Sequence, residues 1–310
     1  MKTIMTVLGP VPSTRLGHCQ LHEHIFVLPT PNSRKYPALE ISDEAKSLAE
    51  LIAYRAAGGG AILDAQPLGA GRDIAALARL SRASGVHIIA VTGYHLPAFY
   101  EADHWIHTEG VDALFERFYG ELMQGVRCDG GEVIYPGAVK SAIGGDGPVG
   151  QMAVCLRAAA RAAARADVPL IMHTEKGAGA LDAIRICGEE GLRRSRIAVC
   201  HVDRQAADWA PHDAIAATGV FMEYDTIART KYHDDESERT LIGHMLDAGY
   251  ANRLLISLDT TAVRLKSYGD PSACGLDFIL RSFIPALRTM GLSEADIENL
   301  TVKNPVRIFE

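Results

Sequence analysis

Short apolar segments alternate with longer amphipathic segments along the whole chain, and this alternation restricts the fold more than any other feature. Eight segments have the length and aliphatic content of buried strands: residues 20–27, 61–65, 86–93, 132–140, 168–174, 196–202, 219–225 and 253–259. Helical patterns lie between or after several of them, over residues 42–58, 72–85, 151–167, 237–249 and 275–291. Alternation of strands and helices is typical of a parallel sheet.

Eight strand–helix units in 310 residues predict a (β/α)₈ TIM barrel, with residues 1–310 forming a single domain. The alternative is an open, doubly wound sheet. That fold usually binds nucleotides through a glycine-rich first turn, and "LGPVPSTRLG" does not match G-x-G-x-x-G. "IGGDGPVG" lacks the Lys-Ser/Thr of a phosphate-binding loop. We therefore favour the barrel.

The composition excludes several classes of protein. The formal net charge is −7, which argues against a broad surface for nucleic acid or for anionic membranes. The N-terminus lacks the long apolar segment of a signal peptide, and no apolar run approaches the ~18 residues of a membrane span. None of the six cysteines forms a C-x-x-C pair, so we expect reduced thiols in a cytoplasmic protein.

Two histidines lie close together in the first predicted strand, "QLHEHIFV". Residues two apart on a strand point to the same side, so His22 and His24 are expected to share a face with Gln20, while Glu23 faces away. Such a pair could bind one cation, or both histidines could be core residues bonded to the backbone; the pair alone favours neither. The zinc-protease motif H-E-x-x-H is excluded because Phe26 occupies its last position.

Four later strands also end in an ionisable residue: Lys140, His173, His201 and Asp259. Barrel enzymes build their active sites at this end of the strands. Imidazole and carboxylate groups suit Zn²⁺, Mn²⁺, Co²⁺ or Fe²⁺, and six candidate ligands suggest two metals with shared bridging groups. Taken alone, Lys140 could instead reach solvent, and Asp259 could cap the next helix.

The motifs that carry these residues resemble the phosphotriesterase family of the amidohydrolase superfamily. "LGPVPSTRLGHCQLHEHIFV" is similar to the opening strand of that family, and "AILDAQPLGAGRD" and "IIAVTGYH" are similar to its next two strands. The lysine of "PGAVK", the histidines of "IMHTE" and "VCHVDR" and the aspartate of "SLDTT" follow in the family's order. "VKNPVRIFE" resembles the usual ending, so the resemblance covers essentially the whole chain.

The resemblance implies a hydrolase with two divalent transition metal ions, most commonly Zn²⁺, with Mn²⁺, Co²⁺ or Fe²⁺ as alternatives. His22, His24 and Asp259 would bind the more buried metal, and His173 and His201 the more exposed one. A carboxylated Lys140 would bridge the two metals together with a hydroxide. The hydroxide would attack the substrate, and Asp259 would act catalytically by accepting its proton.

The loops after the last two strands resemble the branch of the family that acts on phosphorylated sugar lactones. Lys231 of "RTKYH" is similar to the lysine that binds the substrate phosphate in that branch. Arg229, Arg204 and Tyr94 are further candidates for substrate contact, and Tyr224 could also face the pocket. The expected substrate is a small anion whose ester bond is opened.

One position departs from that branch. The arginine expected three residues after Asp259 is replaced by Ala262, and Arg264 or Tyr268 could take its place. A related branch opens cyclic sugar phosphodiesters, so hydrolysis of a phosphoester, either that kind or an organophosphate triester, is the alternative reaction. A barrel that only binds a ligand is a second alternative, disfavoured because all six ligands are present. The resemblance also suggests a homodimer.

Overall fold

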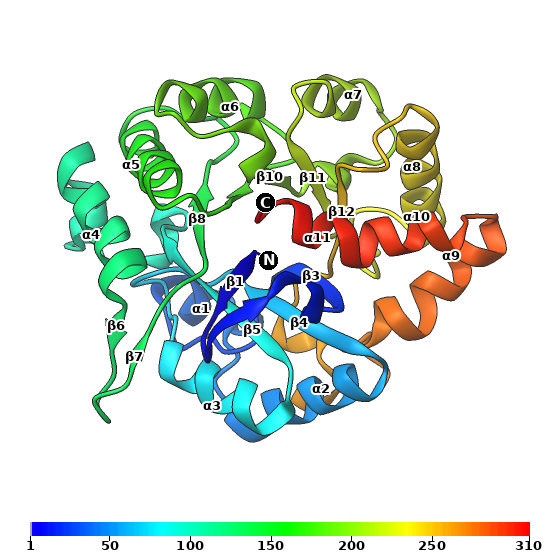
Figure 1. Ribbon diagram of the computed structural model, residues 1–310, viewed down its shortest axis with the longest axis horizontal. Helices are drawn as coiled ribbons and strands as arrows, with labels where there is room; N and C mark the ends of the chain where they lie inside the picture. Colours follow the sequence, from blue (N-terminus) through cyan, green and yellow to red (C-terminus); the bar gives the residue numbers. More distant parts are fainter. Residues whose placement is uncertain (1) are drawn as a thin grey trace.

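Each of the eight apolar segments contributes one strand to a parallel sheet in the computed structural model, which describes residues 2–310 (Figure 1). The strands are β3 (His18–Glu23), β4 (Gly59–Asp64), β5 (His87–Gly93), β8 (Ala138–Ala142), β9 (Leu170–His173), β10 (Ile197–Cys200), β11 (Phe221–Tyr224) and β12 (Leu254–Ile256). They follow one another around the sheet in chain order. The predicted (β/α)₈ barrel is confirmed.

Helices surround the strands on the outside (Figure 1). They are α1 (Pro31–Lys35), α2 (Glu44–Ala56), α3 (Ile74–Ser84), α4 (Val111–Gln124), α5 (Gln151–Ala166), α6 (Ala180–Glu189), α7 (Ala210–Ala216), α8 (Asp235–Asp247), α9 (Ile284–Met290), α10 (Glu294–Glu298) and α11 (Asn304–Arg307). The side chains of Asp43, Asp73 and Asp234 accept hydrogen bonds from backbone amides in the first turns of α2, α3 and α8. None of the helices among residues 2–310 combines the length and the apolar character needed to cross a membrane.

The predicted strand at residues 132–140 is wrong in its boundaries. Val133–Ile134 (β7) pairs with Val126–Arg127 (β6) in a separate antiparallel hairpin, and the barrel strand begins only at Ala138. Pro136 lies between the two pieces and has no amide hydrogen for a strand ladder. At Gly137 the backbone passes so close to another segment that a Cβ atom would lie 2.3 Å from the Met5 carbonyl oxygen.

The barrel interior contains a hydrophobic cluster with at least one residue from every barrel strand. On β10, Ala198 and Cys200 belong to this cluster, whereas Ile197 and Val199 pack in the cluster beneath the helices. This alternation is what a strand with two buried faces produces.

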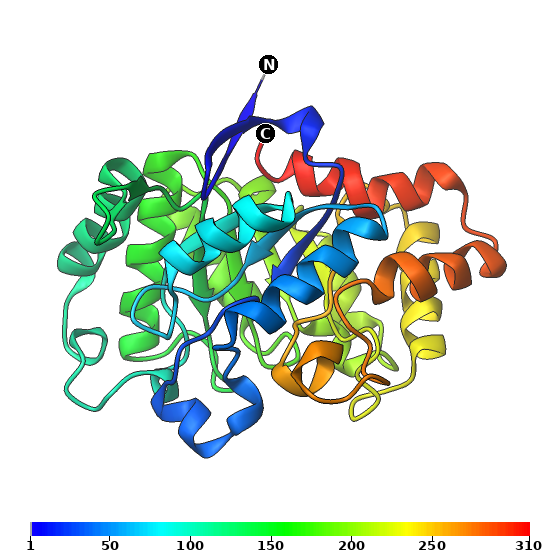
Figure 2. The ribbon, with the colours of Figure 1, turned by 90° about the horizontal axis from the view of Figure 1, so that it is seen from below.

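One end of the barrel is closed by the two ends of the chain. The hairpin of β1 (Thr3–Thr6) and β2 (Gly9–Pro12) lies there, beside the C-terminal residues (Figure 2). Ile4 and Phe309 extend the interior cluster at this end, and the Val7 amide donates to the Ile88 carbonyl near the start of β5. The polar side chains of the candidate site therefore lie at the opposite end of the barrel, at the carboxyl ends of the strands.

The alternation predicted for the first strand is broken. The register between β3 and β4 shifts between Gln20 and Glu23, as at a β-bulge. Gln20 donates to the Leu276 carbonyl, whereas His22 reaches across the barrel to Lys140. The expectation that Gln20 shares a face with the two histidines is therefore wrong, because a bulge shifts the side chains that follow it.

Glu23 closes the seam between β3 and β12, where the two strands share no ladder. Its Oε1 atom accepts from the Leu258 amide at 2.7 Å, and its Oε2 atom accepts from the Thr260 amide at 3.2 Å. The Asp259 amide between them donates to the His22 carbonyl at 3.1 Å. Burial raises the pKa of Glu23 to about 8. The partners of this buried carboxyl group are thus backbone amides of the last strand's loop.

Replacing Glu23 with Gln should destabilise the fold. The variant keeps the shape but places an amide NH₂ group against a backbone N–H, which leaves a buried donor unpaired and costs about 1–3 kcal/mol. Chemical denaturation of the wild type and the variant measures this difference. Glu44→Gln is the control, because Glu44 pairs with Arg79 on the surface and such pairs contribute little. Equal unfolding free energies for Glu23→Gln and wild type would show that the seam does not depend on this carboxylate.

Candidate active site

The structure brings the six predicted ligands together at the carboxyl ends of the strands. The Lys140 Nζ atom lies 2.9 Å from His22 Nε2, and His24 Nε2 lies 3.5 Å from Asp259 Oδ1. The His201 ring is 4.8 Å from the His22 ring and 4.5 Å from the His173 ring, measured between centroids. All six side chains therefore surround one centre.

The backbone is strained where two of these residues follow their strands. His201 has φ +66° and Asp259 has φ +49°, both in the left-handed region that residues with a Cβ atom rarely adopt. Strain of this kind persists only where the surrounding contacts enforce it, and it is typical of functional sites.

Lys140 has an unusual environment for a lysine. Its side chain is fully buried, and no salt bridge joins it to a carboxylate among residues 2–310. Its polar neighbour is an imidazole nitrogen of His22, and burial lowers the pKa of the amine. A neutral amine is the form that reacts with carbon dioxide to give a carbamate, so this environment fits a carboxylated lysine between two metals.

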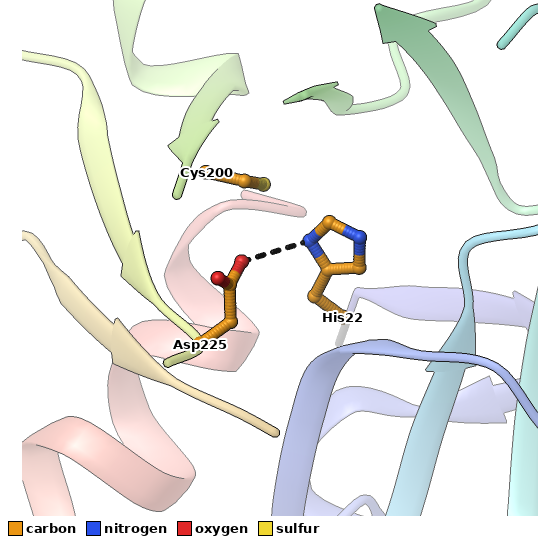
Figure 3. Close-up of side chains that lie close together, drawn as sticks. All are labelled: His22, Cys200 and Asp225. Carbon is orange, nitrogen blue, oxygen red and sulfur yellow. Dashed lines mark ion pairs between the residues drawn. The ribbon is translucent and has the colours of Figure 1, made fainter. Parts of the chain in front are cut away.

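Asp225 links two of the histidines from opposite parts of the barrel. Its Oδ1 atom lies 2.6 Å from His201 Nδ1, and its Oδ2 atom lies 3.0 Å from His22 Nδ1, as drawn for His22 in Figure 3. Burial opposes ionisation of Asp225, but the two histidines lower its pKa below the ordinary value. The carboxylate therefore lies against Nδ1 of both rings, hydrogen-bonded to His201, and this orientation turns Nε2 of each ring towards the centre, where it could bind a metal.

Cys200 lies beside this pair in Figure 3. A ligand atom from each of His22, Cys200 and Asp225 lies within 4.8 Å of the others. Burial raises the pKa of the Cys200 thiol well above its ordinary value, which keeps it protonated. The thiol is therefore a neutral neighbour, whereas the carboxylate sets the orientation of the histidines.

The histidines are held as neutral bases. Burial and the nearby Lys140 lower the pKa of His22 to about 4, and burial also lowers the pKa values of His173 and His201. The Nε2 atom of His173 lies 3.0 Å from Glu175 Oε1, which leaves Nδ1 free. Neutral imidazoles oriented by carboxylates are the form that binds divalent metals.

A cavity of about 230 Å³ lies over this cluster. Its lining includes the apolar side chains of Val27, Leu39, Ile41, Leu96 and Phe99. It also includes Arg204, Arg229, Lys231 and Tyr232, which lie close to one another and form a cationic wall. A larger hollow of about 710 Å³ between α7, α8 and α9 contains none of the predicted ligands. The small cavity is therefore the candidate substrate pocket.

Three of the predicted substrate contacts gather around one aromatic ring. Arg204, Arg229 and Lys231 lie 5.2, 5.8 and 4.6 Å from the centroid of the Tyr232 ring. Arg204 Nη2 donates to Asp259 Oδ2 at 3.1 Å, and Arg229 donates to the same oxygen. Burial opposes ionisation of Asp259, but Arg229 holds its pKa well below the ordinary value. The cationic wall therefore begins at the cluster of predicted ligands.

The structure places two other predicted contacts away from the cavity. Tyr94 is fully buried and stacks on Phe118 of α4, with ring centroids 6.5 Å apart. Arg264 donates to the carbonyl groups of Leu258 and Asp259, so it holds the loop after β12. The expected substrate contacts at Tyr94 and Arg264 do not fit these positions, because both side chains point into the protein.

Two further tyrosines have structural partners. The Tyr224 hydroxyl lies 2.7 Å from His212 Nδ1, and the Tyr268 hydroxyl bonds Ser47 and the Asp43 backbone. Neither residue lines the cavity. Tyr268 therefore does not substitute for the arginine that Ala262 replaces.

His95, which the sequence analysis did not single out, does line the cavity. Its ring stacks on Phe99 at 3.8 Å and lies 5.4 Å from the His173 ring. Its Nδ1 atom accepts from the Leu96 amide at 2.7 Å. His95 follows Tyr94 directly, and neighbouring residues of an extended segment point in opposite directions, so His95 faces the cavity and Tyr94 faces away from it. Asp225 is also the last residue of a predicted strand, residues 219–225, and this position at a strand end is the feature that could have identified it.

Comparison with known proteins agrees with this geometry. The sequence model of the phosphotriesterase family matches residues 2–309. The chain belongs to this family. An N-acetyltaurine hydrolase from Rattus norvegicus is 27% identical, with 97% of this chain and 96% of the relative covered.

Two lactonases are also similar to this family member. A phospho-furanose lactonase from Mycoplasmopsis synoviae is 24% identical, with 99% of this chain and 92% of the relative covered. The crystal structure of a lactonase from Listeria monocytogenes matches with a TM-score of 0.91 and 26% identity, covering 100% of this chain and 99% of that one. The protein is thus a hydrolase of the phosphotriesterase family, with lactonases among its relatives.

Replacing Asp225 with Asn should weaken metal binding. The amide oxygen can accept from one histidine, but the NH₂ group forces the other histidine to accept at Nδ1 and to carry its proton on Nε2. Loss of a partner that orients a metal ligand typically lowers metal affinity by about 10–100-fold. Metal content after dialysis, measured by elemental analysis, checks this. Cys200→Ser is the matched control, because it alters the same cluster without removing the carboxylate. Wild-type metal content in Asp225→Asn would contradict the role of Asp225.

Proposed function

We propose that the protein is a binuclear metal-dependent hydrolase that opens the ester bond of a small anionic lactone, with a phosphorylated sugar lactone as the leading substrate. The observation that carries this proposal is the buried Lys140 amine among histidines, with no acidic partner. A lysine in that environment has a clear role as a carbamate between two metals. Family membership and the lactonase relatives support the reaction class.

The residues present fit two metal ions. His22, His24 and Asp259 would hold one, His173 and His201 would hold the other, and carboxylated Lys140 would bridge them. Three groups of side chains suited to a metal fall within this region among residues 2–310. They are His22, His24 and Asp259; His201, Asp225 and Asp259; and His22, Cys200 and Asp225. Zn²⁺, Mn²⁺, Co²⁺ and Fe²⁺ all suit these ligands. When bound, the metals polarise the substrate carbonyl group and lower the pKa of water.

The protein's own groups hold the ligands and handle the proton. Asp225 and Glu175 keep the ring nitrogens that face the centre free of protons. The Oδ1 atom of Asp259 faces His22 and His24. Its Oδ2 atom faces Arg204 and Arg229. In the proposal, the Asp259 carboxylate accepts the proton of the attacking water, and this proton later reaches the leaving oxygen.

The cationic wall selects an anionic substrate. Arg204 and Arg229 are already paired with Asp259, whereas Lys231 is exposed and has no salt bridge among residues 2–310. Lys231 is therefore the group most available to a phosphate or another anion. Arg264 is used on backbone carbonyl groups, so the loop after β12 supplies no second arginine to the pocket. Phosphoester hydrolysis at the same centre is the second candidate, since the family name and the metal chemistry are compatible with it.

Purified protein should contain about two equivalents of transition metal, and Lys140→Met should lower both metal content and activity. Short-chain carboxylic acids should restore part of the activity, because they can occupy the position of the carbamate. Elemental analysis and lactonase assays with a pH indicator measure these effects. Lys303→Met, a change at an exposed lysine, is the control. Unchanged metal content in Lys140→Met would show that Lys140 is not a metal ligand.

Lys231→Ala should raise KM for phosphorylated lactones about tenfold or more, since a hydrogen bond between charged groups contributes about 1.5–3 kcal/mol. Uncharged lactones should be almost unaffected. Steady-state kinetics with matched sugar lactones, their phosphates and cyclic phosphodiesters test this difference. Lys35→Ala provides a matched control, because Lys35 also lies over a neighbouring tyrosine ring but outside the cavity. An equal loss on charged and uncharged lactones would remove the proposed anion site.

A further inference from the structure

The loop between β11 and α8 carries much of the cationic wall. Arg229, Lys231 and Tyr232 all lie on it, and all three line the cavity. Long cationic side chains on a loop bind a small anion well only if the loop is held in place, because ordering it on binding costs free energy. The question is which contacts hold this loop.

His233, at the end of this loop, bonds acceptors through both ring nitrogens. Its Nε2 atom lies 2.7 Å from the Asp203 carbonyl oxygen, and its Nδ1 atom lies 2.9 Å from the Asp234 carbonyl oxygen. Carbonyl oxygens only accept hydrogen bonds, so a protonated ring nitrogen donates to them. Both ring nitrogens therefore lie beside acceptors, and the side chain is only 11% exposed.

A buried acidic side chain lies beside this ring. Glu238 in the first turn of α8 is fully buried, and its Oε2 atom is 3.1 Å from His233 Nε2. Neither of its oxygens has another polar partner among the described residues. Burial and the nearby acidic groups Asp203, Asp225 and Asp235 raise the pKa of Glu238 well above its ordinary value. The His233 ring is therefore the polar neighbour of a buried acid that has no other.

The same contacts connect the two halves of the cationic wall. Asp203 directly precedes Arg204 in the loop after β10, so His233 ties the loop of Lys231 to the loop of Arg204. A second hydrogen bond also joins these two loops, because Asp203 Oδ2 accepts from the Thr226 amide at 2.6 Å. His233 itself does not line the cavity.

We propose that His233 is a positioning residue for substrate binding: it anchors the β11–α8 loop to the backbone after β10 and to Glu238, and so places Arg229 and Lys231 for the anionic group of the substrate. This inference rests on the proposed function for the identity of the substrate. The anchor itself is independent of that function, because it consists of contacts within the chain.

His233→Gln tests the anchor, because glutamine keeps a polar side chain but lacks the ring whose two nitrogens lie beside both carbonyl groups. KM for a phosphorylated lactone should rise about tenfold, equivalent to about 1.4 kcal/mol. We expect kcat and the kinetics of uncharged lactones to stay close to wild type, since the metal ligands are untouched. Hydrogen–deuterium exchange of residues 226–234 should become faster. Glu238→Gln should shift KM and exchange in the same direction by a smaller amount.

His107→Gln is the matched control, because His107 also bonds a backbone carbonyl group, that of Glu101, in a loop outside the cavity. Wild-type KM and wild-type exchange in His233→Gln would overturn the proposal. An equal loss of kcat on charged and uncharged lactones would also overturn it, since that pattern indicates general damage to the fold. A wild-type enzyme with no preference for anionic lactones would contradict the proposed substrate. The anchor would be rejected separately, by unchanged hydrogen–deuterium exchange in His233→Gln.

Discussion

Closure of the barrel between the first and last strands is the constraint on which the rest of the site depends. The two strands share no ladder there, and the Glu23 carboxyl group joins them by accepting from the Leu258 and Thr260 amides. Asp259 lies between those two residues, so the same contacts set it beside His22 and His24. Residues more than 230 positions apart in the chain thus become neighbours because one buried acid accepts hydrogen bonds from both sides of a loop.

Charge balance then organises the mouth of the barrel. Asp225 binds two histidines, Arg204 and Arg229 share Asp259, and His233 pairs with Glu238. Buried charges are tolerated when each has an oppositely charged or hydrogen-bonding partner. Lys140 differs from these groups because its polar partner is an imidazole nitrogen and no carboxylate pairs with it among residues 2–310, an environment that the proposed metal centre explains. The lactonase relatives and this arrangement support the same reaction class by independent routes.

Much of the site could be predicted because its residues occupy the ends of recognisable strands. Lys140, His173, His201 and Asp259 each close an apolar segment, and the structure brings them together with His22 and His24. Errors arose where strand geometry is irregular. A bulge moved Gln20 off the expected face, Pro136 divided a predicted strand, and the pocket residue is His95 instead of Tyr94. At the bulge and at His95, a shift of one residue reverses the direction of a side chain, whereas Pro136 interrupts the strand itself.

The sequence by itself determined the barrel and the set of candidate ligands, because hydrophobic periodicity and the residue types at strand ends are local properties. Only the tertiary structure decided how those groups are held. The partners of Glu23, Asp225 and His233 come from other strands or loops, at separations that no local pattern specifies. It also decided which cations face the cavity, since Arg264 is drawn to backbone carbonyl groups while Arg229 and Lys231 remain in the wall. Hydrogen-bond partners are chosen by proximity in space, and folding alone creates that proximity.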